Sequence, residues 1–213
     1  FEKTGSVQFD GTGDYLEFAQ NTDLSFGTGD YTVECWIYPQ AVSGNLEIVL
    51  NTGGKNAQTF YLHYDQDQLS VGNQTAFISN QSTTFENSTW YHIVACRFNG
   101  ILKLFRNGVQ VGSNATDTTD WAAGGSIRIG LNSDGAQGVF GNISNLRVIK
   151  GKALYTSNFK PPMRELEVTP ETVLLACQSK TDATLEKTGK VITANGNAVA
   201  SELTPGILTP VPK

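Results

Sequence analysis

The chain has 213 residues, a formal net charge of −5 and a pI near 5.0. This acidic balance excludes nucleic acid as the main partner, because phosphate binding needs a basic surface. No apolar run approaches the roughly 18 to 20 residues of a membrane span, and the 22 glycines and 16% charged residues indicate many turns and few exposed helical faces.

The first 79 residues contain short apolar stretches separated by turn residues. The clearest is YTVECWIY at residues 31–38, which ends at Pro39 because proline cannot donate to a ladder. Asn21 is suited to cap a single helical turn over residues 21–25. The strands expected in this part of the chain are residues 6–9, 15–18, 31–38, 46–50, 59–64, 69–71 and 75–79.

The stretch over residues 90–111 contains two Asn-Gly pairs, Asn99-Gly100 and Asn107-Gly108, each flanked by apolar β-formers. Asn-Gly suits a two-residue hairpin because both central residues need a positive φ. The sequence therefore predicts three antiparallel strands joined by two tight turns. The first strand is apolar on both faces, which is typical of a central strand that is covered on both sides.

Beyond the second hairpin, strands and polar loops continue to alternate. Loops are expected over residues 80–89, 116–125 and 132–138, and an extended crossover over residues 150–164. The remaining expected strands are residues 126–131, 139–149, 172–177, 191–193 and 198–203. We assign residues 1–203 to one domain and residues 204–213, which contain three prolines, to a Pro-rich C-terminal tail or linker.

No apolar period of 3.6 persists over about 11 residues or more, and the strands recur about every 8 to 12 residues. This pattern predicts an all-β protein built from two packed antiparallel sheets. Cys35, Cys96 and Cys177 lie far apart, each in an apolar strand pattern, and are expected to be buried free thiols. The alternative is one disulfide with one cysteine left over.

Several stretches, taken in series, resemble laminin-G-like, concanavalin A-like domains. The similarity covers roughly residues 6–155 and implies a jelly-roll sandwich of two antiparallel sheets. The stretches that carry it are VQFDGTGDYL at 7–16, YTVECWIYP at 31–39, WYHI at 90–93, FRNG at 105–108, IRIG at 127–130 and FGNISNLRV at 140–148.

Residues 147–178 are similar to the ending of laminin-G-like modules in tailed-phage virion proteins, notably of marine cyanophages. This resemblance implies a structural or adhesive module on the virion surface, either a capsid decoration or part of a tail fibre or spike. Its partners would be other virion proteins and a host-surface glycan. Because edge strands invite pairing, we expect a homo-oligomer, a trimer in a fibre or spike. The alternatives are a carbohydrate-active enzyme or its carbohydrate-binding domain, and a secreted bacterial adhesion module.

Some concanavalin A-like proteins are glycoside hydrolases, which need paired carboxylates. The usual Glu-x-Asp-x-Glu triplet does not occur, and Glu34 is the only acidic residue of its strand. Asp65 and Asp67 lie in a predicted turn, and His92 lies in a strand that is apolar on both faces, where a hydrogen-bonded structural role is expected. The sequence therefore predicts a protein that is not an enzyme.

The family resemblance also implies a possible calcium site in the opening turn, where Asp10 and Asp14 match the family pattern. The acidic pair that is usual in the closing strand is replaced here by Ser144 and Asn145. The alternative is that the two aspartates form the turn by bonding their own backbone. We expect no cofactor, with calcium at Asp10 and Asp14 as the open alternative.

A glycan site would need exposed aromatic side chains near polar groups on loops at one rim. Trp121, Tyr64 and the loop that contains Asn132 and Asp134 are the candidates. Trp121 could instead plug the edge of the sandwich, and the loop could simply be solvated.

Overall fold

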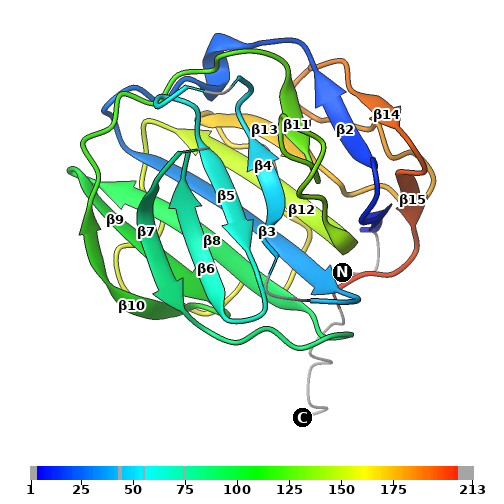
Figure 1. The fold of residues 1–213 in the computed structure, drawn as a ribbon, viewed down its shortest axis with the longest axis horizontal. Helices are drawn as coiled ribbons and strands as arrows, with labels where there is room; N and C mark the ends of the chain where they lie inside the picture. The colour runs from blue at the N-terminus through cyan, green and yellow to red at the C-terminus, as the bar shows by residue number, and fades with distance from the viewer. Residues whose placement is uncertain (1–3, 43–44, 55, 74, 206–213) are drawn as a thin grey trace.

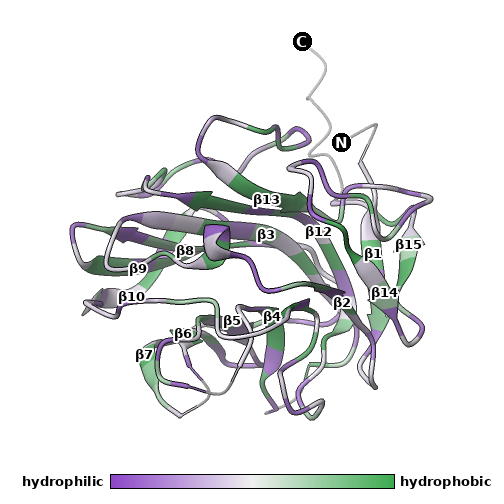
Figure 2. Cartoon of the chain, turned by 90° about the horizontal axis from the view of Figure 1, so that it is seen from above, coloured by the Kyte–Doolittle hydropathy of each residue, from purple (hydrophilic) through white to green (hydrophobic). Residues whose placement is uncertain are grey.

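The computed structural model describes residues 4–42, 45–54, 56–73 and 75–205. It is a sandwich of two antiparallel sheets, which we call sheet A and sheet B. Figure 1 looks onto sheet B with sheet A behind it, and Figure 2 shows the two layers from above. The all-β jelly-roll sandwich predicted from the sequence is confirmed.

Sheet A has eight strands. In spatial order they are β10 (Val109–Thr116), β9 (Ile101–Arg106), β8 (Tyr91–Phe98), β3 (Tyr31–Pro39), β12 (Phe140–Lys150), β1 (Ser6–Asp10) and β15 (Val199–Ser201), and β13 (Thr172–Ala176) pairs with the second half of β12.

Sheet B has seven strands. In spatial order they are β14 (Thr193–Asn195), β2 (Tyr15–Phe18), β11 (Ile127–Ile129), β4 (Glu47–Asn51), β5 (Tyr61–Tyr64), β6 (Gln68–Gly72) and β7 (Phe77–Ser82). One 3₁₀ turn, η1 (Thr22–Leu24), is capped by the Asn21 side chain, which accepts from the Asp23 amide. It is the only helix in the described part of the chain and is far too short to cross a membrane.

Both Asn-Gly turns form as predicted. Asn99 and Gly100 have φ of 48° and 73°, and Asn107 and Gly108 have φ of 52° and 77°. They join β8 to β9 and β9 to β10 with two-residue loops. The predicted strand at 75–79 and the following loop are shifted, because β7 starts at Phe77 and its polar residues continue the ladder with β6 as far as Ser82.

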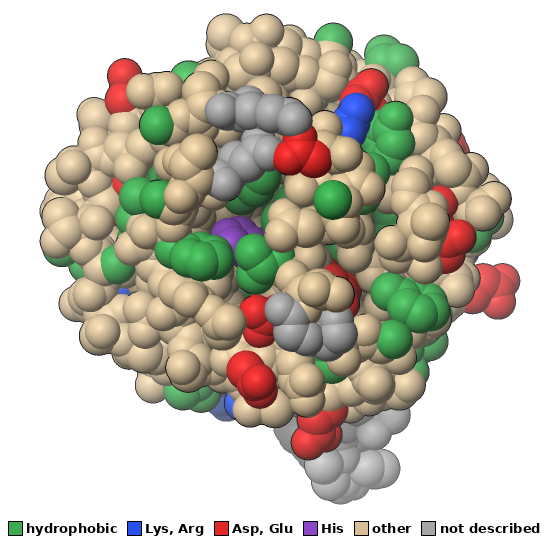
Figure 3. Space-filling view, viewed as in Figure 1, with side chains coloured by type: hydrophobic (Ala, Val, Ile, Leu, Met, Phe, Trp, Pro, Cys, Tyr) green, Lys and Arg blue, Asp and Glu red, His purple; other side chains and the backbone are tan. Residues whose placement is uncertain are grey.

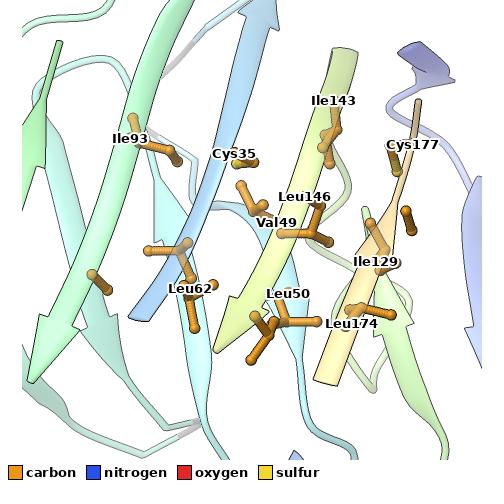
Figure 4. Packing of buried hydrophobic residues seen from close by; sticks show 14 of the residues in the cluster. Cys35, Val49, Leu50, Leu62, Ile93, Ile129, Ile143, Leu146, Leu174 and Cys177 are labelled. Carbon is orange, nitrogen blue, oxygen red and sulfur yellow. The ribbon is translucent and has the colours of Figure 1, made fainter. Parts of the chain in front are cut away.

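The core lies between the sheets, where side chains from both inner faces interdigitate. Cys35, Ile93 and Ile143 of sheet A meet Val49 and Leu62 of sheet B (Figure 4). Inward-facing residues alternate with outward-facing ones along each strand, so every second side chain enters this core. All three cysteines are buried and free, as predicted.

The outer face of sheet A is covered by the segment between β12 and β13. We call residues 151–164 the strap. Tyr155 and Phe159 of the strap pack on Val94, Cys96 and Phe105 of sheet A. This contact confirms that β8 is covered on both sides.

Candidate functional site

The outer face of sheet B carries an open hollow of about 410 Å³. In Figure 3 it lies near the centre of the face, with a histidine at its floor between apolar side chains. Its lining comes from β4, β5, the turn from β6 into β7, and the loop over residues 132–137. The first three segments lie within residues 46–77 and the loop is far from them in the sequence, so the hollow is a product of the fold.

The alternation of β5 decides which of its side chains reach the hollow. Leu62 and Tyr64 point inward and belong to the core. Tyr61 and His63 have the opposite parity and line the hollow. Ile48 of β4 is the cross-strand neighbour of His63 and lies on the same face.

His63 forms the floor of the hollow and is only 2% exposed. Its ring stacks on Phe77, with centroids 5.1 Å apart and an interplanar angle of 25°. Neither ring nitrogen has a hydrogen-bond partner in the described residues. Burial lowers the pKa of His63 to about 4, so the imidazole is neutral near pH 7 and offers one donor and one acceptor.

The loop at one side of the hollow is built around Asn132. Its Oδ1 accepts from the amides of Ala136, at 2.9 Å, and Gln137, at 3.3 Å, while its Nδ2 donates to Gln137 Oε1 at 3.0 Å. On the other side, Asn73 Oδ1 accepts from the Thr75 amide at 2.8 Å. Both asparagines therefore fix the shape of the rim.

Two of the predicted glycan residues, Asn132 and Asp134, do line the hollow. Asn132 is buried and shapes the loop, whereas Asp134 is exposed at the rim. The structure thus brings the predicted loop to an open site, but with different aromatic neighbours from those expected.

The expectation that Trp121 and Tyr64 are exposed is wrong. Trp121 is fully buried, packs edge-on against Phe60 and donates from Nε1 to Asp117 Oδ2 at 2.9 Å. This is the plugging role weighed as its alternative. Tyr64 is also fully buried and donates to Glu47 Oε2 at 2.6 Å.

The residues that the sequence reasoning missed are Ile48, His63 and Phe77. For His63 a signal was available, because Leu62 and Tyr64 share one face of the strand and leave Tyr61 and His63 to the other. Phe77 is 46% exposed, and no periodicity in its short polar segment marks it as a surface aromatic.

Asp10 and Asp14 form a backbone-bonded turn. Asp10 Oδ1 accepts from the Thr12 amide at 2.8 Å, and Asp14 accepts from the amides of Asp10 and Asn197. In the described residues no group of three or more His, Cys, Asp or Glu side chains is arranged to hold a metal ion. The geometry matches the turn-forming alternative. The replacement of the family's acidic pair has a structural role as well, because Ser144 Oγ donates to the Gly5 carbonyl at 2.6 Å.

A second polar cluster lies beneath the strap, on the outer face of sheet A. Glu34 accepts from Arg147 Nη2 at 2.6 Å and from Tyr155 Oη at 2.9 Å, and it lies 3.1 Å from His92 Nε2. Burial alone would raise the pKa of Glu34, but its contacts with His92 and Arg147 hold the pKa below its usual value. Glu34 and His92 are fully enclosed, so we assign this cluster a structural role. The expectation that His92 is a hydrogen-bonded structural residue is confirmed.

Comparisons with known proteins agree with this architecture. A laminin-G family model, described as concanavalin A-like lectin/glucanases superfamily, matches residues 10–155. A search of curated protein sequences gave no significant match.

Solved structures with similar folds include a Bacteroides ovatus protein provisionally described as carbohydrate binding, with a TM-score of 0.66 and 14% identity. The match covers 94% of this chain and 60% of that one, so this chain spans less than two thirds of its length. The heptameric SAP-like pentraxin of Limulus polyphemus has a TM-score of 0.59 and 17% identity, over 91% of this chain and 95% of that one. The CBM40 module of a Ruminococcus gnavus sialidase, bound to α2,3-sialyllactose, has a TM-score of 0.52 and 14% identity, over 70% and 91%.

Proposed function

Because the chain belongs to the laminin-G-type family of the concanavalin A-like lectin and glucanase superfamily, we propose that it is a non-catalytic carbohydrate-binding module. The ligand would lie in the hollow of sheet B. The observation that carries this proposal is an open site of about 410 Å³ that combines an exposed aromatic ring, Phe77, with polar groups on two loops. Ligand sites are typically concave and apolar, with a few placed polar groups.

The structural neighbours give support at the level of the fold. The R. gnavus module was solved with a bound glycan, and the B. ovatus protein carries a description as carbohydrate binding. At 14% identity these similarities do not identify a ligand for this chain. The proposal therefore depends on the hollow of sheet B.

The test is glycan-array binding followed by titration of the best glycan. Phe77→Ala should weaken binding about tenfold or more, because the ring is the exposed aromatic surface of the hollow. Phe98→Ala is the matched control, since Phe98 is 48% exposed against 46% for Phe77 but lies on sheet A. The absence of any bound glycan, or equal losses in both variants, would refute the proposal.

One observation favours the enzyme alternative. Glu47 and Asp10 line a neighbouring hollow of about 300 Å³, and burial raises the pKa of Glu47 to about 7 while hydrogen bonding lowers that of Asp10. Carboxyl groups with pKa values pushed apart are typical of glycosidases. However, Glu47 is bonded to Tyr64 and to the Phe140 amide, and the carboxylate of Asp10 is bonded within its turn and to Asn197. Release of reducing sugar that is lost in Glu47→Gln would establish an enzyme.

We also propose that the module works on a virion surface, as part of a capsid decoration or a tail fibre or spike, and that it self-associates. The support is the resemblance of residues 147–178 to phage virion modules, together with the edge strands β10 and β15, on which Val109 and Val199 are exposed. Electron microscopy of an intact particle tests the location. A monomer by light scattering, alone and with virion partners, would contradict the self-association.

A further inference from the structure

The hollow of sheet B adjoins a second hollow. The neighbouring hollow of about 300 Å³ shares three lining residues with it, Leu46, Ala136 and Gln137. We call this second one the end hollow, because it is lined by the end of β1, the start of β4 and the start of β12, where strands of both sheets end. The three shared residues form a saddle between the two hollows.

The saddle carries no aromatic or charged side chain. Ala136 ends at its Cβ, and the side chain of Gln137 is held within its own loop, because its Oε1 accepts from Asn132 Nδ2 at 3.0 Å. Each hollow alone is near the lower limit of the roughly 300–1,000 Å³ that is typical of ligand sites. Joined across the saddle, the two lie well within this range and run from the outer face of sheet B to the end of the sandwich.

The alternation of β4 directs neighbouring side chains to different hollows. Ile48 lines the hollow of sheet B, whereas Glu47 has the opposite parity and lines the end hollow. Glu47 is only 5% exposed, and its Oε2 accepts from Tyr64 Oη at 2.6 Å and from the Phe140 amide at 3.1 Å. Its Oε1 has no hydrogen-bond partner among the described residues, but it is not closed off from solvent, so it faces the open space of the end hollow.

A saccharide chain matches this arrangement. Its successive sugars offer C–H faces and hydroxyl groups along the whole chain. Phe77 and Ile48 give the hollow of sheet B an apolar surface, whereas Glu47 gives the end hollow an acceptor for a hydroxyl. A single sugar would use only one of these surfaces, because the saddle lies between them.

We propose that the ligand is an oligosaccharide of two or more sugars, bound along its chain across the saddle. One sugar lies against Phe77, and the next lies in the end hollow, where Glu47 Oε1 accepts a hydrogen bond from one of its hydroxyl groups. This inference rests on the proposed function and names its ligand class, which is a saccharide chain and not a terminal sugar alone.

The first experiment titrates a length series, from the monosaccharide to the hexasaccharide, prepared from the tightest glycan on the array. Affinity should rise about tenfold or more between the monosaccharide and the fragment that occupies both hollows, because the added sugar gains a hydrogen bond to a carboxylate. Longer fragments should add little. Equal affinities for the monosaccharide and every longer fragment would overturn the inference.

The second experiment fills the end hollow and leaves the hollow of sheet B open. Thr12 is exposed and lines only the end hollow. Because the three native cysteines are buried, N-ethylmaleimide should modify Thr12→Cys at position 12 alone. Compared with the unlabelled variant, the labelled one should bind the longer fragments about tenfold more weakly and the monosaccharide equally well. Thr118→Cys, labelled in the same way, is the matched control, since Thr118 is exposed and lines neither hollow.

A third measurement tests the acceptor. Glu47→Gln exchanges the carboxylate for a neutral amide of the same shape and should weaken binding of the longer fragments about fivefold, because hydrogen bonds to ionised groups are the stronger ones. Its melting temperature at the pH of the titration shows that the variant is folded. If the gain in affinity with length is the same in Glu47→Gln as in the wild type, the role of Glu47 is refuted.

The outcomes separate this inference from the function on which it rests. If the monosaccharide binds as tightly as the longer fragments and Phe77→Ala weakens it, the binding module stands and binding along a chain is refuted. If the label at position 12 weakens no fragment, the end hollow is not part of the site. If it weakens all fragments equally, the ligand lies in the end hollow alone, and the site proposed at Phe77 is wrong as well. If the wild-type chain binds no glycan, the proposed function itself fails.

Discussion

Sheet A and sheet B each bury one histidine and one glutamate, but the surroundings of these residues differ. In sheet A, His92 and Glu34 bond to each other, and Arg147 adds a cation. In sheet B, His63 has no partner among the described residues, and Glu47 has a tyrosine and an amide in place of a cation. The pKa of Glu34 is accordingly lowered, whereas that of Glu47 is raised to about 7.

The strap explains this difference. It covers the outer face of sheet A, so most polar groups beneath it must be satisfied within the protein, and of the His92 ring only Nδ1 is left without a partner. The centre of the outer face of sheet B is an open hollow. One outer face is therefore closed by the chain itself, whereas the centre of the other is open.

The largest expected effect comes from breaking the cluster under the strap. Arg147→Met leaves Glu34 buried without its cation and should lower the free energy of unfolding by about 3–5 kcal/mol. Denaturant unfolding measures this effect. The control is Lys187→Met, which removes a cation from an ion pair whose side chains are about a third exposed and should cost far less. Equal losses in the two variants would contradict a structural role for the cluster.

His63 and Glu47 of sheet B should give opposing pH dependences of stability. Burial lowers the pKa of His63. Its contribution to the free energy of unfolding is therefore complete above pH 6.5 and is lost as the pH falls towards 4. Burial raises the pKa of Glu47. Its contribution to the free energy of unfolding is therefore complete below pH 4.5 and is lost as the pH rises towards 7. Each amounts to about 3 kcal/mol, and the two nearly cancel in the wild-type chain.

Single variants should separate the two contributions. Relative to wild type, His63→Leu should gain stability as the pH falls from 7 to 4.5, and Glu47→Gln should lose stability over the same interval. Urea unfolding at pH 4.5 and pH 7 checks both signs. If the free energy of unfolding changed with pH in the same way in all three proteins, neither group would have the pKa shift that its burial predicts.

A smaller effect tests how the strap is anchored. Gly100 and Gly108 occupy equivalent positions in the two Asn-Gly turns, with φ of 73° and 77°. Alanine at either position costs about 1 kcal/mol for the positive φ. At Gly108 a Cβ would also overlap the Phe159 carbonyl of the strap, whereas at Gly100 the nearest atom is 3.8 Å away. Gly108→Ala should therefore cost about 1–2 kcal/mol more than Gly100→Ala.

The smallest expected effect concerns metal. A chelator should leave the melting temperature unchanged, because Asp10 and Asp14 are already bonded to backbone amides of the turn and of Asn197. Adding calcium afterwards should also have no effect. A fall in melting temperature with the chelator that calcium restores would instead assign these aspartates to a metal site.

Local signals in the sequence were sufficient for most of the architecture. The Asn-Gly pairs predicted the β8–β9–β10 meander because the turn chemistry resides in the two residues themselves. The doubly apolar pattern of β8 predicted cover on both faces, and the strap supplies it.

The candidate site was predicted only in part, because it depends on contacts between distant segments. The loop at Asn132 and Asp134 was found from its polarity, but its position next to β5 and β7 follows from the sheet order. Trp121 was misplaced because a tryptophan in a polar loop can fold back into the core, where Asp117 satisfies its N–H. Tyr64 was predicted to be exposed, although the alternation of its strand puts it on the inner face with Leu62.

Strands β14 and β15 set the smallest piece of this chain that can be transplanted as a unit. β14 completes sheet B beside β2, and β15 completes sheet A beside β1. Both strands lie beyond residue 155, where the family match ends. A graft cut at that boundary would leave β1 and β2 with unpaired backbone groups, open to strand exchange between neighbouring copies. The smallest unit with both sheets complete is therefore longer than residues 10–155, the stretch that matches the family model.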